Sequence, residues 1–414
     1  MPPSHHEGKI DIPLDIIELI MEKLAEDKDM EALKRSSLTC RSFRSICQQH
    51  IFATIKLDFS KPPFENPLAS RFRQLADRKP FIASYVRTLE YVDLVGSRRE
   101  ASVLRRFSRV NAFTFGFKDE FPLRSGPPKQ DWNKAPTSLQ SSLYSFIQAN
   151  NITQLYLFNI GNFPKYLLLH LPALSLLGIC RVNFTDSSPS ATFIGNEVTP
   201  KLSFLIAQLG QDLLTVRDLL GWGLANSRSS MIDIRRLKQF VARTEDQPAA
   251  MRIIGQLLKA TESIESRSPT LNCLGSIASA LSPKSLKTLK TIGLSLMLQS
   301  VDIDPYLGLT KELEAISGRN VLEQIVLDIA ISIDTDRHYT ISPRKWGELD
   351  VVLSVADGFP LLHRLEVTIT LHCYCHLGHQ ESLEKVWDIG RSEFPRLVAA
   401  GKVEFIFDAR IELL

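Results

Sequence analysis

The chain has 414 residues, 44% of them hydrophobic and 23% charged; these are the proportions of a folded protein and exclude a largely disordered one. Its 49 basic residues nearly balance its 46 acidic ones, and the net charge of +3 argues against a protein whose main task is to grip nucleic-acid phosphates. The length is too great for one ordinary core and suits two or three domains, unless the chain is a repeat array.

Cysteine use and targeting signals favour a reducing compartment. The six cysteines are sparse and unevenly spaced, and they show no disulfide framework. The polar N-terminus, which we expect to be disordered over residues 1–9, lacks the apolar core of a signal peptide. The longest uncharged run, Tyr166 to Cys180, contains Pro172 and is shorter than the roughly 20 residues of a bilayer span. We therefore expect a cytoplasmic and/or nuclear protein with no membrane partner.

The first ordered stretch, "IDIPLDIIELIMEKL", predicts an amphipathic helix with a broad apolar side. Pro13 suits the position just ahead of the first turn, where its missing N–H costs nothing. At 100° per residue, one half of the helix carries most of the apolar side chains. These side chains are Ile16, Ile17, Ile20, Met21 and Leu24, with Leu14 at the margin. Such a face either meets the core of this chain or docks on a partner.

Two further short helices are predicted. Asp29 is placed to cap a helix over Met30–Leu38, and the third helix has apolar residues at helical spacing. The third set is Phe43, Ile46, Cys47, His50 and Ile51, with Cys40 one turn earlier. Three short helices in about 45 residues bury too little surface to be comfortable alone, so a further contact is expected.

The sequence "IPLDIIELIMEKLAEDKDMEALKRSSLTCRSFRSICQQHIF" resembles an F-box, especially the fungal type. The family pattern begins with Leu-Pro and an acidic residue two positions on, which Ile12-Pro13 and Asp15 match. It ends in Val-Cys-Arg-x-Trp-Arg, which the run from Thr39 to Arg44 matches with Thr for Val and Phe for Trp. The resemblance covers roughly a tenth of the chain.

The resemblance implies a function by docking. F-box proteins insert this helical unit into the Skp adaptor of cullin–RING ubiquitin ligases, while the rest of the chain selects a protein substrate. The residues that the resemblance places at the adaptor are Pro13, Leu14, Ile16, Ile17, Ile20, Leu24, Leu33, Leu38, Cys40 and Phe43. The alternative is that the helices only cap the domain that follows.

The rest of the chain alternates strand-like and helical segments. We expect an F-box over 10–57, a linker and helix over 58–85 that begins with the Pro-rich "SKPPFENP", and a repeat region over 86–414. Helices are predicted at "LASRFRQLADR", "SLQSSLYSFIQAN", "GLTKELEAISG" and "KWGELDVVLSVAD". The predicted strands are 86–94, 110–117, 152–160, 171–179, 286–296, 321–331, 361–371 and 402–411, with weaker copies near Pro200 and Ile234.

Several strands share the frame L-x-x-L-x-L-x-x-I of leucine-rich repeats. It begins at Ile152 and Leu171, and more loosely at Leu322 and Leu362. The predicted fold class is therefore α/β, with an irregular leucine-rich-repeat-like solenoid of short parallel strands and helices like those behind many fungal F-boxes. Because the spacing between copies varies, a generic α/β fold with a parallel sheet is the rival.

Two polar stretches, Lys118–Ser138 and Thr185–Pro200, are predicted to be long loops. Insertions of this kind in solenoids fall on one face, often the binding face. An idle loop explains them equally well.

Chemistry-bearing motifs are few. The chain has none of the common nucleotide-binding, zinc-protease or nucleophile-elbow patterns, so it offers no catalytic or cofactor-binding residue. "HCYCHLGH" (372–379) contains two Cys and three His, but strand alternation turns Cys373 and Cys375 inward and the histidines away, which disfavours a metal. The Arg-rich run from Arg98 to Arg109 is best explained as a solvated helix face rather than a nucleic-acid site.

These patterns favour a substrate receptor of an SCF-type ubiquitin ligase. It would bind the Skp adaptor and through it a cullin, have no active site and no cofactor, and hold an unidentified protein substrate near the ubiquitin-charged enzyme. An F-box scaffold outside any cullin complex is the first alternative. An α/β enzyme with a helical N-terminal cap is the second.

Overall fold

The computed structural model describes residues 13–59, 67–92, 101–116, 128, 130–186, 198–207, 210–221, 230–243, 248–271, 278, 281–298, 306, 308–333, 346–373, 383–384, 386–388 and 392–413. The described chain is a mixed α/β protein built on parallel strands. It divides into two compact units, one of Met1–Lys118 with Gln130–Leu155, and one of Asp119–Lys129 with Tyr156–Leu414.

The first unit combines three N-terminal helices with three parallel strands. Strands β1, β2 and β3 pair in chain order, with Leu57 opposite Tyr91 and Tyr91 opposite Phe115. An aromatic core lies behind them, where Phe113 contacts Phe146 at a ring-centroid distance of 4.7 Å. The elements are α1 (Leu14–Glu26), α2 (Met30–Ser36), α3 (Arg41–Ile51), β1 (Thr54–Asp58), α4 (Pro67–Arg78), η1 (Pro80–Tyr85), β2 (Thr88–Val92), η2 (Ser102–Arg106), β3 (Ala112–Gly116), β4 (Gln130–Asp131), η3 (Trp132–Lys134) and α6 (Thr137–Ala149).

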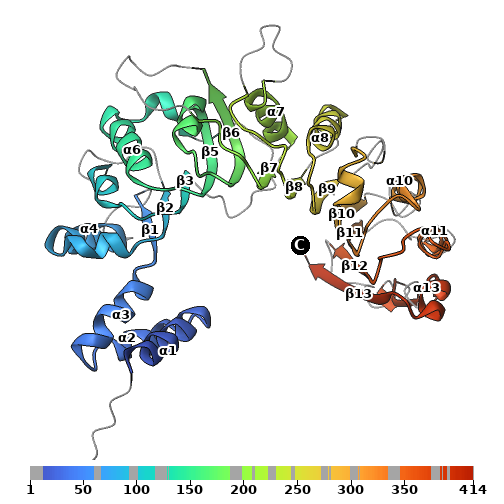
Figure 1. Cartoon of the computed structure of the whole chain (residues 1–414), viewed down its shortest axis with the longest axis horizontal. Helices are drawn as coiled ribbons and strands as arrows, with labels where there is room; N and C mark the ends of the chain where they lie inside the picture. The colour runs from blue at the N-terminus through green and yellow to red at the C-terminus, as the bar shows by residue number, and fades with distance from the viewer. Residues whose placement is uncertain are drawn as a thin grey trace, which may run out of the picture. The chain divides into compact units, whose positions relative to one another are not determined.

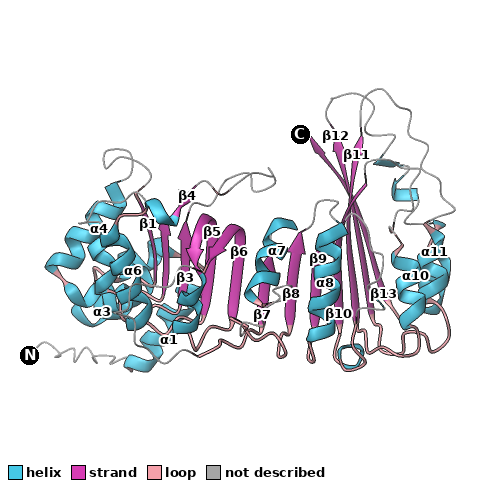
Figure 2. Cartoon of the chain, turned by 90° about the horizontal axis from the view of Figure 1, so that it is seen from above, coloured by secondary structure: helices cyan, strands magenta, loops and turns pink. Residues whose placement is uncertain are grey.

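The second unit is a ladder of parallel strands with helical or turn connections. From β6 to β13 each strand pairs in parallel with the next along the chain. Figures 1 and 2 show its helices on one side of the strands. Its elements are β5 (Gln154–Pro164), η4 (Lys165–His170), β6 (Leu176–Thr185), β7 (Phe204–Ala207), α7 (Gly210–Leu219), β8 (Gln239–Arg243), α8 (Pro248–Ala260), β9 (Ser266–Leu271), η5 (Ser285–Lys287), β10 (Thr291–Leu298), α10 (Leu309–Ile316), β11 (Gln324–Ile333), α11 (Gly347–Leu353), β12 (Arg364–Cys373), α13 (Pro395–Ala400) and β13 (Glu404–Leu413).

Strand alternation sorts the side chains of this ladder into buried and polar rows. The in-register pairing aligns Leu294, Leu327, Val367 and Phe407 across four strands, and the first three are at most 2% exposed. The alternate positions carry polar and charged groups such as Asp328 and Asp408. A period of two thus produces one apolar and one polar face, and the apolar rows form a continuous core beneath the helices.

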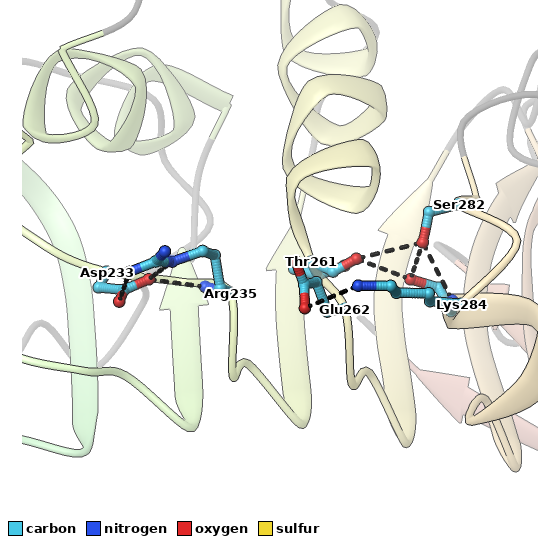
Figure 3. Close-up of polar contacts among 7 residues, drawn as sticks. Asp233, Arg235, Thr261, Glu262, Ser282 and Lys284 are labelled. Atoms are coloured by element: carbon cyan, nitrogen blue, oxygen red, sulfur yellow. Dashed lines mark hydrogen bonds and ion pairs between the residues drawn. The ribbon is translucent and has the colours of Figure 1, made fainter.

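Polar contacts join the turns that precede the strands (Figure 3). The hydroxyls of Ser282 and Ser285 donate to the Thr261 carbonyl at 3.3 and 3.0 Å, and Lys284 Nζ lies 3.1 Å from Glu262 Oε2. Arg235 forms two side-chain hydrogen bonds to Asp233. These turns carry backbone polar groups that no helix satisfies, so the side-chain contacts fix the position of each strand start.

Two buried asparagines make similar sets of three hydrogen bonds at helix C-termini. Asn320 Nδ2 donates to the carbonyls of Ile316 and Gly358, and its Oδ1 accepts from the N–H of Leu322. Asn150 makes the equivalent three bonds to Phe146, Phe107 and Val110 in the first unit. Each amide therefore closes a helix C-terminus and ties it to a neighbouring turn.

The predicted helices and most predicted strands are confirmed, with displaced boundaries. The first apolar position of each frame, such as Ile152 or Leu322, is buried but lies in the turn before the strand. These side chains pack beneath the turn, and each strand therefore begins two to five residues after the first apolar residue of its frame. Within β6 the frame is wrong: Leu177, not Leu176, shares the buried row of Leu205.

Other elements lie where no strand or helix was predicted. Strands β1 and β9 and helices α7 and α8 are additions, and β1 occupies the last residues of the 10–57 range. The predicted loop 118–138 ends in ordered structure, where Trp132 is 4% exposed against the aromatic core. The weaker copies near Pro200 and Ile234 correspond to β7 and β8. Residues 1–9, Ile12, most of 118–129 and 187–197 lie outside the described residues.

Candidate functional site: the N-terminal helices and the polar face of the ladder

The three N-terminal helices begin at residues suited to their caps. Pro13 precedes α1, and its carbonyl accepts from the N–H groups of Ile16 and Ile17 at 3.2 and 3.3 Å. The Asp29 carboxylate accepts from the Ala32 N–H at 3.0 Å, as the sequence predicted. The Cys40 thiol caps α3 by accepting from the Phe43 N–H at 3.4 Å. The three helices are therefore closed units with short, defined connections.

A small core holds the helices together. Partly buried Leu24, Ala25, Phe43 and Ile51 surround its fully buried members. Cys47 Sγ lies 3.5 Å from Met21 Sδ at its centre. The buried members are Ile17, Met21, Leu33, Ile46 and Cys47.

Large aliphatic side chains remain exposed on these same helices. Of the twelve exposed large hydrophobics in the described part of the chain, six lie between residues 14 and 38, and we call these six the exposed apolar set. They are Leu14 (53% exposed), Ile16 (44%), Leu19 (60%), Ile20 (50%), Met30 (37%) and Leu38 (77%). Single exposed aliphatics are ordinary, but such a concentration marks an interaction surface.

Helix geometry places three members of this set together. Residues at i, i+3 and i+4 are neighbours on a helix surface, so Ile16, Leu19 and Ile20 share one side of α1. Ile17 and Met21, also four residues apart, form the stripe that faces the core. Helix α1 therefore carries two apolar stripes. One is buried among the three N-terminal helices α1–α3, which we call the trio, and the other is exposed.

The structure separates the predicted adaptor-binding residues into three groups. Exposed members are Pro13, Leu14, Ile16, Ile20, Leu38 and Cys40; half-buried members are Leu24 and Phe43; buried members are Ile17 and Leu33. Because Ile17 and Leu33 are 9% and 0% exposed, they stabilise the trio and are not offered at its surface.

Sequence reasoning missed two members of the exposed set, Leu19 and Met30. Leu19 falls near Glu18, Glu22 and Lys23 on the helical projection, on the side assigned to solvent. An aliphatic residue amid the charges of an otherwise polar face was the available signal.

Charged pairs border the trio. Lys23 Nζ lies 3.2 Å from Glu26 and 3.3 Å from Asp27, and the hydrogen bond to Glu26 is the main cause that raises the pKa of Lys23. The hydrogen bond from Lys34 lowers the pKa of Glu31. These exposed pairs lie within one helix or at its end, so they support local helix structure and add little else.

A second candidate surface is the polar face of strands β10–β13. Arg364 contacts Glu366 at 3.0 Å and Glu404 at 3.6 Å. Arg410 Nε donates to Thr370 Oγ1 at 3.0 Å. The in-register rows of this face are Thr291, Gln324, Arg364 and Glu404; Gly293, Val326, Glu366 and Ile406; Ser295, Asp328, Thr368 and Asp408; and Ala330, Thr370 and Arg410.

Asp328 is the titratable group of this face with a clear perturbation. Burial raises the pKa of Asp328, the nearby Glu366 raises it further, and Arg410 opposes both. The side chain is nonetheless exposed to solvent by area. Because Asp328 is exposed, its carboxylate can meet a partner's charge directly.

The zinc-like cluster is described only at its start. His372 is half-buried, with Nε2 3.5 Å from Glu412 Oε2, and β12 ends at Cys373. Residues 374–382 lie outside the described residues. Within the described ranges, no group of three His, Cys, Asp or Glu side chains has metal-binding geometry.

Described members of the Arg-rich run make contacts within the first unit. Arg105 Nη2 donates to Ser141 Oγ at 3.1 Å, and Arg106 pairs with the Ala76 carbonyl and with Asp77. Arg98 and Arg99 lie outside the described residues. The contacts of Arg105 and Arg106 give these two side chains a structural role.

A small pocket between β10 and α10 is apolar. Its one carboxylate, Glu312, accepts from the Ala278 N–H at 2.5 Å. The remaining lining residues are Ala278, Leu281, Ile292, Leu294, Leu309, Leu313 and Ile316. Among the described residues of this lining there is no pair of titratable groups of the kind on which acid–base catalysis depends.

No family model matches the chain, and no curated protein matches its sequence. Within the residues that the structure describes, no helix combines the length and apolar composition needed to cross a bilayer.

Proposed function

We propose that the three N-terminal helices are an F-box and that the chain is a substrate receptor of an SCF-type cullin–RING ubiquitin ligase. The observation that carries this proposal is the exposed apolar set on α1 and α2 and in the turn before α3. A cap that served only the following domain would bury these side chains against that domain, whereas Ile16 and Ile20 are 44% and 50% exposed.

The energy available at this surface suits an adaptor. Complete burial of a Leu or Ile side chain is worth about 1.5–3 kcal/mol, so a half-exposed one still offers about 1 kcal/mol. Ile16, Leu19 and Ile20 together supply several kcal/mol on one helix side, and Leu38 and the half-buried Phe43 extend the contact. A few such side chains dominate the affinity of typical interfaces.

The ladder of the second unit supports the receptor half of the proposal. Its strands follow one another in chain order and in parallel, with helices on one side, as an irregular leucine-rich-repeat-like solenoid requires. The polar face of β10–β13 presents charged side chains on a rigid sheet, which suits recognition of a protein surface. The receptor acts by raising the effective concentration of its substrate at the ligase.

The test is co-purification of the full chain with a Skp adaptor. Ile16→Asp and Ile20→Asp should each abolish it, because an unpaired carboxylate would be buried in an apolar contact. Val398→Asp is the matched control, since Val398 is 62% exposed on α13, and it should bind normally. Circular dichroism checks that each variant is folded. Normal adaptor binding by both folded isoleucine variants refutes the proposal.

Pull-down of a cullin subunit separates a ligase receptor from a scaffold that uses the same adaptor contact. A receptor brings the cullin with the adaptor, and the Ile20→Asp variant loses both. Recovery of the adaptor without any cullin assigns the chain to the scaffold class.

A further inference from the structure

Among the described strands, β13 lies at one end of the ladder and has a long edge that no described strand covers. Within the described residues β12 is the one strand that pairs with it, and the pairing covers all ten residues from Glu404 to Leu413. The terminal strand β1 of the first unit has five residues. Edge strands of natural proteins are usually short or protected, whereas this edge is ten residues long and has no proline, and its charges are Glu404, Asp408, Arg410 and Glu412.

The backbone N–H and C=O groups of successive β13 residues point alternately toward β12 and toward the open edge. The Glu404 N–H donates to the His363 carbonyl, which turns the N–H and C=O groups of even-numbered residues toward β12. In a parallel ladder the odd-numbered residues then direct theirs to the other side. Phe405, Phe407, Ala409, Ile411 and Leu413 therefore present donors and acceptors along the edge.

The apolar side of the edge is incompletely covered. Phe405 and Phe407 are half-buried, unlike Leu365 and Val367 in the same rows of β12, which are 0% exposed. Phe407 contacts Trp387, also half-buried, at a ring-centroid distance of 5.8 Å. Strand β12 has a neighbouring strand on each side, and these neighbours cover Leu365 and Val367. A further strand beside β13 would complete the burial of Phe405 and Phe407 in the same way.

The charges on β13 make it complementary to itself. We propose that two copies of this chain associate by antiparallel pairing of their β13 strands, centred on Ala409. In this register the exposed Asp408 of each copy lies opposite the exposed Arg410 of the other, which gives two cross-strand ion pairs. Phe407 and Ile411 fall opposite each other as hydrogen-bonded backbone pairs.

The neighbouring registers are disfavoured by like charges or by length. Centring on Asp408 would place the two Asp408 carboxylates together and Glu404 opposite Glu412. Centring on Arg410 would oppose the two guanidinium groups. Centring on Phe407 pairs Glu404 with Arg410 but overlaps only residues 404–410, whereas the Ala409 register overlaps 405–413. Charge and length together therefore select one register.

The test is the molar mass of the full chain across about a hundred-fold range of concentration around the micromolar affinities of small interfaces. Light scattering should show the mass rising from the monomer value toward twice that value. Asp408→Arg or Arg410→Asp should each weaken association about ten-fold, because two attractive pairs become repulsive. The double variant Asp408→Arg/Arg410→Asp should recover most of the wild-type affinity.

Two further variants keep the result interpretable. Ala409→Pro removes an edge-directed N–H without removing a bond to β12, and it should weaken association. Lys402→Glu changes the charge by the same amount outside the overlapping residues, and it should leave association unchanged. Circular dichroism confirms folding.

Three outcomes overturn the proposal. A wild-type chain that stays monomeric throughout is one, and a dimer insensitive to Asp408→Arg, Arg410→Asp and Ala409→Pro is another. A dimer lost in Ile20→Asp but kept in Asp408→Arg would place the contact on the N-terminal helices. The first two outcomes leave the adaptor proposal untouched, because the dimer proposal does not rest on the ligase function. The third would make a second copy a rival occupant of the exposed apolar set, which co-purification with the adaptor then tests.

Discussion

The N-terminal helices and the strand ladder treat their aliphatic side chains differently. In the ladder, paired strands align Leu294, Leu327 and Val367 in one buried row, and helices cover it. In the helical trio, five residues are buried while six large aliphatics stay exposed. The two regions draw on similar apolar residues, and only the ladder has enough surrounding structure to cover them.

This difference indicates which region mainly contributes stability and which region offers a surface for binding. A ladder of parallel strands gives each strand a neighbour for every row, so its core is continuous and its remaining face is polar. A trio of short helices has too little volume to enclose two apolar stripes of α1, and the second stripe, with Ile16, Leu19 and Ile20, is left for another surface. We therefore expect core changes in the ladder to affect stability and surface changes in the trio to affect binding.

The largest expected effect comes from breaking a buried row of the ladder. Leu327→Ala should lower the free energy of unfolding by about 3 kcal/mol, because it removes a fully buried side chain and leaves a cavity among rigid strands. Urea denaturation followed by circular dichroism measures the change. Adaptor binding at low urea should be preserved.

The matched control is Val355→Ala, at a side chain 51% exposed. It should change the free energy of unfolding by less than about 0.5 kcal/mol. Equal losses in Leu327→Ala and Val355→Ala would contradict the assignment of the stabilising core to the buried rows.

The second-largest loss in the free energy of unfolding is expected when a buried asparagine at a helix C-terminus is removed. Asn320→Ala removes three buried hydrogen bonds and leaves the carbonyls of Ile316 and Gly358 and the Leu322 N–H to find other partners. The expected loss is about 2 kcal/mol in the free energy of unfolding. Asn150→Ala, with the same three-bond pattern in the first unit, should cost a similar amount. A loss under about 0.5 kcal/mol in both variants would show that water replaces these bonds.

Much of this arrangement follows from local sequence patterns. The Asp29 cap and the three helices could be predicted because capping residues and helical spacing act within a few residues. Most ladder strands could be predicted because short apolar stretches alternate with polar ones along the chain, and four of these stretches share the L-x-x-L-x-L-x-x-I frame. Local rules also gave the apolar side of α1 correctly for Ile17 and Met21.

What the sequence left undecided depends on contacts between distant segments. Whether Ile16 or Ile17 is buried is set by where α3 packs, and Ile46 and Cys47 occupy the side of Ile17. Strand β9 contains Pro269, a residue that argues against a strand, yet it pairs with both β8 and β10. The frame that begins at Leu171 selects Leu176, and only the register with β7 shows that its neighbour Leu177 lies in the buried row.

A smaller effect should appear when a cap in the trio is removed. Asp29→Ala loses the hydrogen bond to the Ala32 N–H and should destabilise α2 by about 1 kcal/mol. Hydrogen–deuterium exchange of the amides in Met30–Ser36 should become faster, while exchange in the ladder strands stays the same. Asp29→Ser keeps an acceptor and should exchange like the wild type, and faster exchange throughout the ladder would mean that the two regions unfold together.

The smallest effect concerns Asp328 on the polar face of the ladder. Because burial and Glu366 raise its folded pKa, this group favours the folded state most when protonated, and that contribution is lost as pH rises through the folded pKa. Asp328→Asn should therefore raise the free energy of unfolding at pH 7, by about 0.5 kcal/mol or less because the side chain is largely exposed. Below the unfolded pKa of about 4 the pH-dependent part of the difference should vanish.

Denaturation of wild type and Asp328→Asn across this pH range measures the difference in the free energy of unfolding. Glu366→Gln should shrink this difference, because it removes one cause of the raised pKa of Asp328. A free energy of unfolding that is lower for Asp328→Asn than for the wild type at pH 7, with the gap closing toward acid pH, would mean that attraction to Arg410 outweighs burial. The polar face would then be a stabilising network instead of a surface held for a partner.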